Sequence, residues 1–182
     1  MKTLGEPQTA LEARAERAIR SLPIVDAASA TYAASAPPVA SPSYHAVESA
    51  SFEIAPDGKE AILFLRLGAD EVAELVDDNV AFAAARRLHS LGLSPEPIAR
   101  VPGERAVLFS RLGEGWRTAK IDDLMHESAA ARLVETQMTI ATGKPFGRPW
   151  SVFDGIDRLW PLVCKAGAGL PGEVEWMLAG MP

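Results

Sequence analysis

The residues of this sequence that could carry out chemistry are few, and their spacing matches no catalytic set. Paired acids occur at Asp122-Asp123 and at Asp154 and Asp157, but no histidine stands two positions before any of them. Acids at these places are also typical of the first turn of a helix, where the helix dipole favours negative charge. The chain has no Walker loop, no Gly-x-Ser-x-Gly elbow, no His-Glu-x-x-His pair and no Cys-x-x-Cys pair. We therefore predict no catalytic residue and no metal ligand in this sequence.

One cation, Arg66, lies near the end of a predicted strand, and the elements around it are well marked. Two apolar runs flank Asp57-Gly58, a dipeptide typical of a tight hairpin turn. A helix is predicted over Asp70–Gly92, with its glycine at the C-terminal end. A second hairpin is predicted over Ile98–Leu112, with its turn at Pro102-Gly103-Glu104. This order predicts an α+β fold, in which a mostly antiparallel sheet of about five strands packs against one helix.

The same order resembles the N-terminal half of the choline/ethanolamine kinase and aminoglycoside phosphotransferase superfamily. Leu63–Gly68 resembles the third strand of that family, and Leu91–Pro95 resembles the turn after its helix C. Ala106–Gly115 resembles its strand-to-hinge segment, and Phe146–Ile156 resembles the segment before its catalytic half. The similarity covers most of residues 50–180. It implies a protein-kinase-like N-lobe followed by a helical extension.

The resemblance also implies a candidate nucleotide site. In this family a strand cation holds the phosphates of the nucleotide, and Arg66 matches that position. The hinge backbone holds the base, and Phe109, Ser110, Arg111 and Leu112 match the hinge. ATP with magnesium is implied as a ligand only together with a partner subunit, and no cofactor is assigned to the chain alone.

The expected phosphate-binding loop departs from the family pattern. It is expected near Ser41–Ala46, and there is no glycine between Gly5 and Gly58. A phosphate cradle needs close backbone approach and positive φ, which glycine allows, and Pro42 lacks an amide donor. A preformed phosphate cradle is therefore not expected.

The expected partner of the strand cation is also missing. The helix glutamate that would pair with Arg66 is expected at Ala81, and Glu74, Asp77 and Asp78 are alternatives if the helix is shifted by about one turn. Arg66 has a second interpretation, as a strand-edge cation with no nucleotide nearby. The family's His-x-Asp-x-x-x-x-Asn loop is absent, and the sequence is expected to end where that half begins. This polypeptide alone is expected to be inactive.

Composition excludes several classes of protein. The net charge of −6 and the pI near 5.1 argue against a nucleic-acid-binding protein. The single cysteine, Cys164, fits a reducing cytoplasm and is interpreted as a small buried side chain. No apolar run approaches the ~18 residues of a membrane span, and no signal peptide is recognisable. A soluble cytoplasmic protein is expected.

Four parts are predicted along the chain. Residues 1–24 form an amphipathic helix capped by Thr9, which either packs on the outside of the domain or docks another chain. Residues 25–43 form an Ala/Ser/Pro-rich linker or irregular wrap. Residues 44–115 form the kinase-like N-lobe, and residues 116–182 form the helical extension.

Two functions from different classes remain open. The first, which we favour, is a non-catalytic subunit, a pseudokinase-like scaffold or regulator bound to a protein partner. The second is half of a split small-molecule phosphotransferase that binds ATP together with a separately encoded catalytic half. The partner is expected to be a chain with that catalytic half or a second copy of this chain. A relic with no function of its own is a third possibility.

Overall fold

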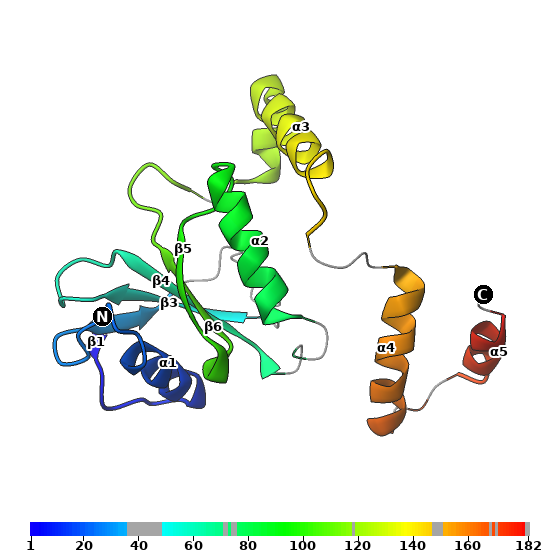
Figure 1. Ribbon diagram of the computed structural model, residues 1–182, viewed down its shortest axis with the longest axis horizontal. Coiled ribbons are helices and arrows are strands. Elements are labelled where there is room, and N and C mark those ends of the chain that lie inside the picture. The colour runs from blue at the N-terminus through cyan, green and yellow to red at the C-terminus, as the bar shows by residue number, and fades with distance from the viewer. Residues whose placement is uncertain are drawn as a thin grey trace. The chain divides into compact units, whose positions relative to one another are not determined.

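The computed structural model describes residues 1–35, 49–70, 73, 76–117, 119–146, 151–167, 169 and 171–180. They belong to two compact units, Met1–Lys144 and Pro145–Pro182, and each is described by itself. The strands, shown in Figure 1, are β1 (Lys2–Thr3), β2 (Thr31–Ala34), β3 (Ser49–Ala55), β4 (Leu63–Gly68), β5 (Pro97–Val101) and β6 (Ala106–Ser110). The helices are α1 (Ala10–Arg20), α2 (Asp78–Ser90), α3 (Glu127–Ala141), α4 (Val152–Lys165) and α5 (Glu173–Ala179). Two short 3-10 helices are η2 (Pro102–Glu104) and η3 (Ile121–Met125).

The first unit is built on a six-stranded sheet in the order β1-β2-β3-β4-β6-β5. All five neighbouring pairs are antiparallel. This confirms the predicted α+β fold and both predicted hairpins. Gly58 has φ of +73° in the turn between β3 and β4, a conformation that glycine adopts without strain. In the second turn, Arg105 takes the left-handed conformation with φ of 50° directly after η2.

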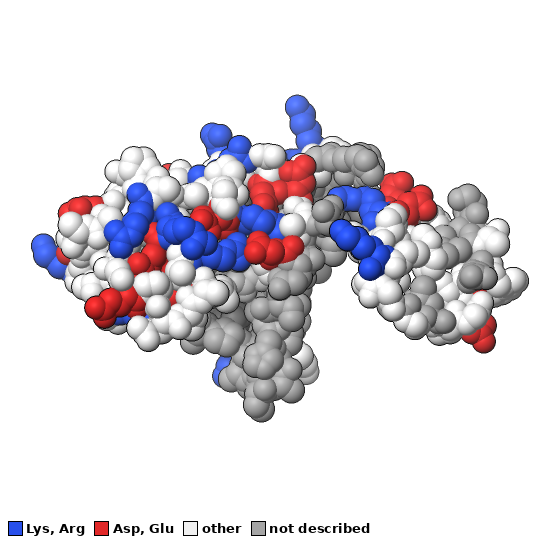
Figure 2. All heavy atoms as spheres, turned by 90° about the horizontal axis from the view of Figure 1, so that it is seen from below, with Lys and Arg blue, Asp and Glu red and all other residues white. Residues whose placement is uncertain are grey.

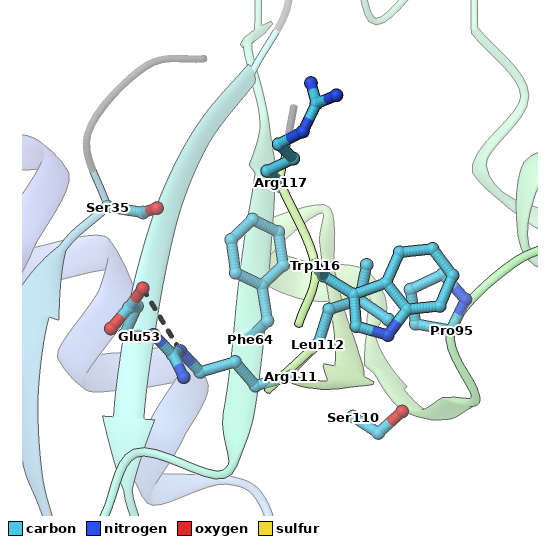
Figure 3. Close-up of a pocket in the computed structure, with 9 residues that line it drawn as sticks. All are labelled: Ser35, Glu53, Phe64, Pro95, Ser110, Arg111, Leu112, Trp116 and Arg117. Carbon is cyan, nitrogen blue, oxygen red and sulfur yellow. Dashed lines mark ion pairs between the residues drawn. The ribbon is translucent and has the colours of Figure 1, made fainter. Parts of the chain in front are cut away.

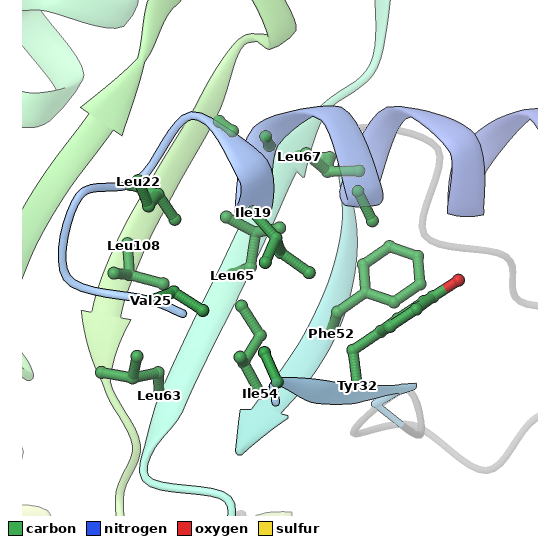
Figure 4. Close-up of a cluster of buried hydrophobic side chains, with 14 residues drawn as sticks. Ile19, Leu22, Val25, Tyr32, Phe52, Ile54, Leu63, Leu65, Leu67 and Leu108 are labelled. Atoms are coloured by element: carbon green, nitrogen blue, oxygen red, sulfur yellow. The ribbon is translucent and has the colours of Figure 1, made fainter. Parts of the chain in front are cut away.

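One face of the sheet carries the hydrophobic core, and helix α1 covers that face. Along β4, Leu63, Leu65 and Leu67 are buried and Arg66 is exposed, because successive side chains of a strand point to opposite faces. Helix α1 adds Ile19, which is fully buried. The buried cluster, drawn in Figure 4, consists of Ala15, Ala18, Ile19, Leu22, Val25, Ala30, Tyr32, Phe52, Ile54, Leu63, Leu65, Leu67, Ala106 and Leu108.

A buried carboxylate fixes α1 to the sheet. Glu16 is 5% exposed, and its Oε1 accepts a hydrogen bond of 2.9 Å from the hydroxyl of Tyr32 on β2. Its Oε2 accepts a hydrogen bond of 2.8 Å from the backbone N–H of Gly5, and Arg20 lies 3.5 Å from the same oxygen. Burial and the nearby carboxylate raise the pKa of Tyr32 well above its ordinary value. Helix α1 is therefore an integral part of this unit.

Part of the range 25–43 is a strand, so the linker prediction is wrong for residues 31–34. These residues form β2, which pairs with both β1 and β3. Val25, Ala30 and Tyr32 are buried in the core cluster. The alanine-rich composition gives no sign of a strand here. Its one large core residue, Tyr32, is buried against α1 and hydrogen-bonded to Glu16, and this contact cannot be read from the local sequence. Residues 36–43 lie outside the described ranges.

Helix α2 begins later than predicted, at Asp78 rather than Asp70. Asp77 caps it, because its carboxylate accepts hydrogen bonds from the backbone N–H groups of Asn79 and Val80. The predicted end is confirmed, since Gly92 has φ of +71° just past the last turn. Arg66 and Val107, which alternate with core-facing residues of β4 and β6, line one small pocket with the first turn of α2. Helix α2 therefore lies on the face of the sheet opposite α1.

Two successive residues of the second turn bind helices on opposite faces of the sheet. The carboxylate of Glu104 accepts hydrogen bonds of 2.6 and 3.0 Å from Arg17 on α1, and Arg14 lies 3.8 Å from it. The next residue, Arg105, donates hydrogen bonds of 2.9 and 3.1 Å to the carboxylate of Asp78 on α2. The face seen in Figure 2 shows basic and acidic side chains interleaved in a band across the first unit, as expected for such paired charges.

Helices form in the part of the sequence that was predicted as a helical extension, residues 116–182. Residues 121–141 form η3 followed by α3. In the second unit, Ser151 caps α4, because its Oγ accepts a hydrogen bond of 3.0 Å from the N–H of Asp154. Cys164 on α4 is exposed, so its interpretation as a buried side chain is wrong. Within the described ranges, no helix is long and apolar enough to cross a bilayer.

Candidate functional site

A pocket of about 410 Å³ opens on the face of the sheet opposite α1. It lies where the ends of β2 and β4 meet the segment that follows β6, and Figure 3 shows the side chains that surround it. A pocket of this volume is in the range that small molecules occupy in proteins. Its lining residues are Ser35, Glu53, Phe64, Pro95, Ser110, Arg111, Leu112, Trp116 and Arg117.

Strand register brings the central residues of this pocket together. Glu53 on β3 and Phe64 on β4 are directly opposite each other in the ladder, so their side chains emerge on the same face. The carboxylate of Glu53 pairs with Arg111, with 3.2 Å between Oε1 and Nε. Both side chains are about one-third exposed, at 31% and 35%. This ion pair joins β3 to the segment after β6 along one side of the pocket, as the dashed line in Figure 3 shows.

The predicted hinge residues reach this pocket in part. Ser110, Arg111 and Leu112 line it, whereas Phe109 does not. Phe109 instead faces Phe64 across the β4–β6 ladder.

Backbone hydrogen bonds distinguish the three hinge residues that line the pocket. The N–H of Ser110 donates to the carbonyl of Glu96, and the N–H of Arg111 donates to the carbonyl of Ile62, both at 2.9 Å. The backbone N–H and carbonyl of Leu112 have no hydrogen bond with any described residue. Leu112 therefore offers both groups to a ligand.

Arg66 lies on the same face of β4 but outside this pocket. It lines a separate hollow of about 70 Å³ together with Ala81, Asp78 and Arg105. The structure thus brings Arg66 near Ala81, the helix position at which the sequence predicts its missing glutamate. No hydrogen bond or ion pair joins Arg66 to any described residue.

The alternative acids on α2 do not pair with Arg66. Asp78 binds Arg105, and this carboxylate raises the pKa of the Arg105 guanidinium above its ordinary value. Asp77 binds the backbone of α2 as its cap. Glu74 lies outside the described residues, as do Ser41–Ala46 of the expected phosphate-binding loop.

Sequence reasoning missed the side chains that give the pocket its chemical character. Phe64 precedes Arg66 by two residues. Because side chains two residues apart in a strand lie on the same face, the sequence could have placed Phe64 beside Arg66. Glu53 could be found only from the β3–β4 register. Trp116 is 70% exposed at the rim, and Arg117 pairs with Asp123 at 2.5 Å. That ion pair and the backbone N–H of Lys120 lower the pKa of Asp123.

Comparison with known proteins supports the fold. No protein-family model matches the sequence, and no curated protein sequence matches it. The structure is similar to the crystal structure of a choline/ethanolamine kinase family protein from Mesorhizobium loti, with a TM-score of 0.58 and 18% sequence identity. The chain has a kinase-like fold. The match covers 92% of this chain and 50% of that chain, so this chain spans about half the length of that protein.

Among the described residues, the groups that line the pocket support binding of a ligand but no complete catalytic set. The pocket offers two aromatic side chains, two serine hydroxyls, a compensated ion pair and the backbone groups of Leu112. The described residues contain no group of three or more His, Cys, Asp or Glu side chains that could hold a metal ion. These groups can bind and orient a ligand, but they include no paired nucleophile and base.

Proposed function

We propose that this chain is a non-catalytic kinase-like subunit that acts as a scaffold or regulator bound to a protein partner. The observation that carries this proposal is the environment of Arg66. Helix α2 presents Ala81 to the hollow that Arg66 lines, and the nearest described acid, Asp78, binds Arg105. Phosphoryl transfer requires a cation that is oriented toward the phosphates, and no described carboxylate forms an ion pair that would orient the Arg66 guanidinium.

Exposed apolar side chains of the first unit support a docking role. Ile121 and Met125 on η3 are 84% and 83% exposed, and Val134 and Met138 on α3 are 62% and 59% exposed. Apolar side chains grouped on neighbouring elements are characteristic of interaction surfaces. We propose that this surface, the η3–α3 surface, contacts the partner. The partner is a helical chain that resembles the catalytic half of the kinase-like fold, or a second copy of this chain.

The test is co-purification of the tagged chain with its partner, followed by assay of the complex for phosphoryl transfer. Met125→Glu on the η3–α3 surface is expected to abolish capture, while Arg66→Ala is expected to leave capture unchanged. The complex is expected to show no transfer activity that depends on Arg66. Loss of measurable transfer on Arg66→Ala would refute the non-catalytic assignment.

A second candidate is the N-terminal half of a split small-molecule phosphotransferase that binds ATP with a catalytic partner. The observation that favours it is the hinge segment, where the N–H and carbonyl of Leu112 lie beside the pocket and have no hydrogen bond with a described residue. In this candidate Arg66 and residues 109–112 hold ATP and magnesium in the assembled complex. A captured partner with a His-x-Asp-x-x-x-x-Asn sequence and ATP-dependent activity would favour it over the first.

A further inference from the structure

Helix α3 contributes no buried residue to the first unit. All fifteen of its residues are described, none of them is buried, and the helix packs on η3, apart from the sheet (Figure 1). A helix of about 12–15 residues is only marginally stable in water by itself, and helices in proteins are stabilised mainly by packing of an apolar face. The exposed apolar side chains of the η3–α3 surface therefore form a face that another element can cover.

Acidic side chains border the apolar residues of α3. Glu127 precedes Val134 by seven residues, or two helical turns, so these two side chains share a face of the helix. Glu135 precedes Met138 by three residues and is its neighbour on the helix surface. The one basic residue of η3 and α3, Arg132, is two residues before Val134, which places it on another side of the helix. The α3 part of the surface is therefore apolar at its centre and acidic at its edge.

Helix η3 adds a third carboxylate to this edge. Asp122 precedes Met125 by three residues, and side chains at this spacing are aligned in a 3-10 helix. The adjacent Asp123 binds Arg117, but the carboxylates of Asp122, Glu127 and Glu135 have no hydrogen bond or ion pair with any described residue. The η3–α3 surface therefore carries negative charge that the described part of the first unit does not neutralise.

We propose that the η3–α3 surface binds a basic amphipathic helix of the partner chain. The apolar stripe of such a helix covers the exposed apolar side chains, as in other complexes in which a helix lies in an apolar groove. Lysine or arginine residues beside the stripe meet the three carboxylates, and complementary charges of this kind favour association with the correct partner. This inference rests on the docking role proposed above and specifies the chemistry of the partner segment.

Charge also argues that this segment belongs to a different chain and not to a second copy. Helix α4 is amphipathic and has exposed apolar side chains at Val152 and Phe153, but it carries two acidic and two basic residues and therefore no net charge. The η3–α3 surface of a second copy would bring carboxylates against carboxylates, which repel each other. Neither element supplies the positive charge that the surface requires.

The experiment is fluorescence anisotropy of labelled helical peptides titrated with the whole chain. One peptide of roughly 18 residues, about five helical turns, has leucine at positions i, i+3, i+4 and i+7 of its repeat and lysine at the flanking positions. The second peptide has the same leucines and has glutamate in place of every lysine. The lysine peptide is expected to bind at least about tenfold more tightly at low salt, and this preference is expected to shrink in about 0.5 M NaCl because salt screens exposed charges.

Paired variants separate this surface from the general negative charge of the chain. Glu127→Gln combined with Glu135→Gln is expected to weaken binding of the lysine peptide about three- to tenfold, because two exposed ion pairs are lost. Glu6→Gln combined with Glu60→Gln is the matched control, since both acids are exposed on the first unit outside this surface. The control removes the same charge and is expected to change the dissociation constant by less than about twofold.

Equal affinity for the two peptides, an equal loss of affinity in the control, or absence of binding of the lysine peptide would each overturn the inference. A dimer of the chain, seen by analytical ultracentrifugation and dissociated by Met125→Glu, would overturn it as well, because a second copy would then cover the surface. The proposed function fails on a different result, namely partner capture that survives Met125→Glu. Capture that requires Met125 but is unchanged by Glu127→Gln with Glu135→Gln would leave the proposed function intact and overturn this inference alone.

Discussion

Removing the hydroxyl of Tyr32 tests whether α1 is part of the domain. The hydroxyl donates a hydrogen bond of 2.9 Å to the carboxylate of Glu16, a residue that is only 5% exposed. Tyr32→Phe keeps the ring and leaves Oε1 without this donor. A hydrogen bond to a charged group contributes about 1.5–3 kcal/mol, so the unfolding equilibrium constant is expected to rise roughly 10- to 150-fold. That is a large share of the ~5–15 kcal/mol that stabilises a typical domain.

The measurement is urea unfolding followed by far-UV circular dichroism, with the midpoint and slope fitted for each variant. Glu16→Gln provides the second background, because its neutral amide oxygen still accepts the hydrogen bond from Tyr32. There Tyr32→Phe is expected to cost only about 0.5–1.5 kcal/mol, which gives a coupling of roughly 1 kcal/mol between the two positions. A cost below about 0.5 kcal/mol in the native background, or an equal cost in both backgrounds, would refute the assignment of a buried, charge-assisted hydrogen bond.

Three further predictions concern the same unit. Ile19→Ala is expected to lower the free energy of unfolding by about 2–5 kcal/mol, and Leu11→Ala on the exposed side of α1 by less than about 1 kcal/mol; similar losses would contradict the packing of α1. Because burial raises the pKa of Tyr32 above its ordinary value, the folded state keeps the phenolic proton longer, so stability is full below pH ~10 and falls as the pH rises further. Denaturation midpoints between pH 9 and 11.5 should therefore fall more steeply for the native chain than for Tyr32→Phe. Ala81→Glu is expected to add up to about 1 kcal/mol at low salt, and the gain should disappear when Arg66→Ala is combined with it; a gain that survives would place position 81 away from Arg66.

The hairpins and the end of α2 could be predicted from sequence because their signals are local. Asp57-Gly58 specifies a turn whose glycine has positive φ, and Gly92 ends a helix in the same conformation. The start of α2 was less predictable, since several acids in 70–78 satisfy the same capping preference. Only the structure shows that Asp77 is the residue whose carboxylate binds the helix backbone.

The strand β2 and the pocket could not be predicted because they depend on long-range pairing. Tyr32 stands among alanine and serine, and its burial follows from Glu16, sixteen residues earlier on another element. Similarly, the sequence predicted a hinge segment that includes Leu112, but it did not predict that Glu53 contacts this segment. That contact depends on the register of β3 against β4 and on the path of the chain after β6.

The adjacency of Glu104 and Arg105 has a mechanical consequence. Glu104 accepts hydrogen bonds from Arg17 on α1, and Arg105 donates hydrogen bonds to Asp78 in the first turn of α2. Two consecutive residues therefore connect the helices on the two faces of the sheet. The two side chains point to opposite faces of the sheet although Arg105 itself has a left-handed backbone, with φ of 50°. A displacement of α1 would therefore pull on Glu104, which precedes Arg105 in the chain, and Arg105 lines the hollow together with Arg66. Helix α1 is thus linked, through two consecutive residues, to the opposite face of the sheet, which carries the candidate pocket and the hollow lined by Arg66.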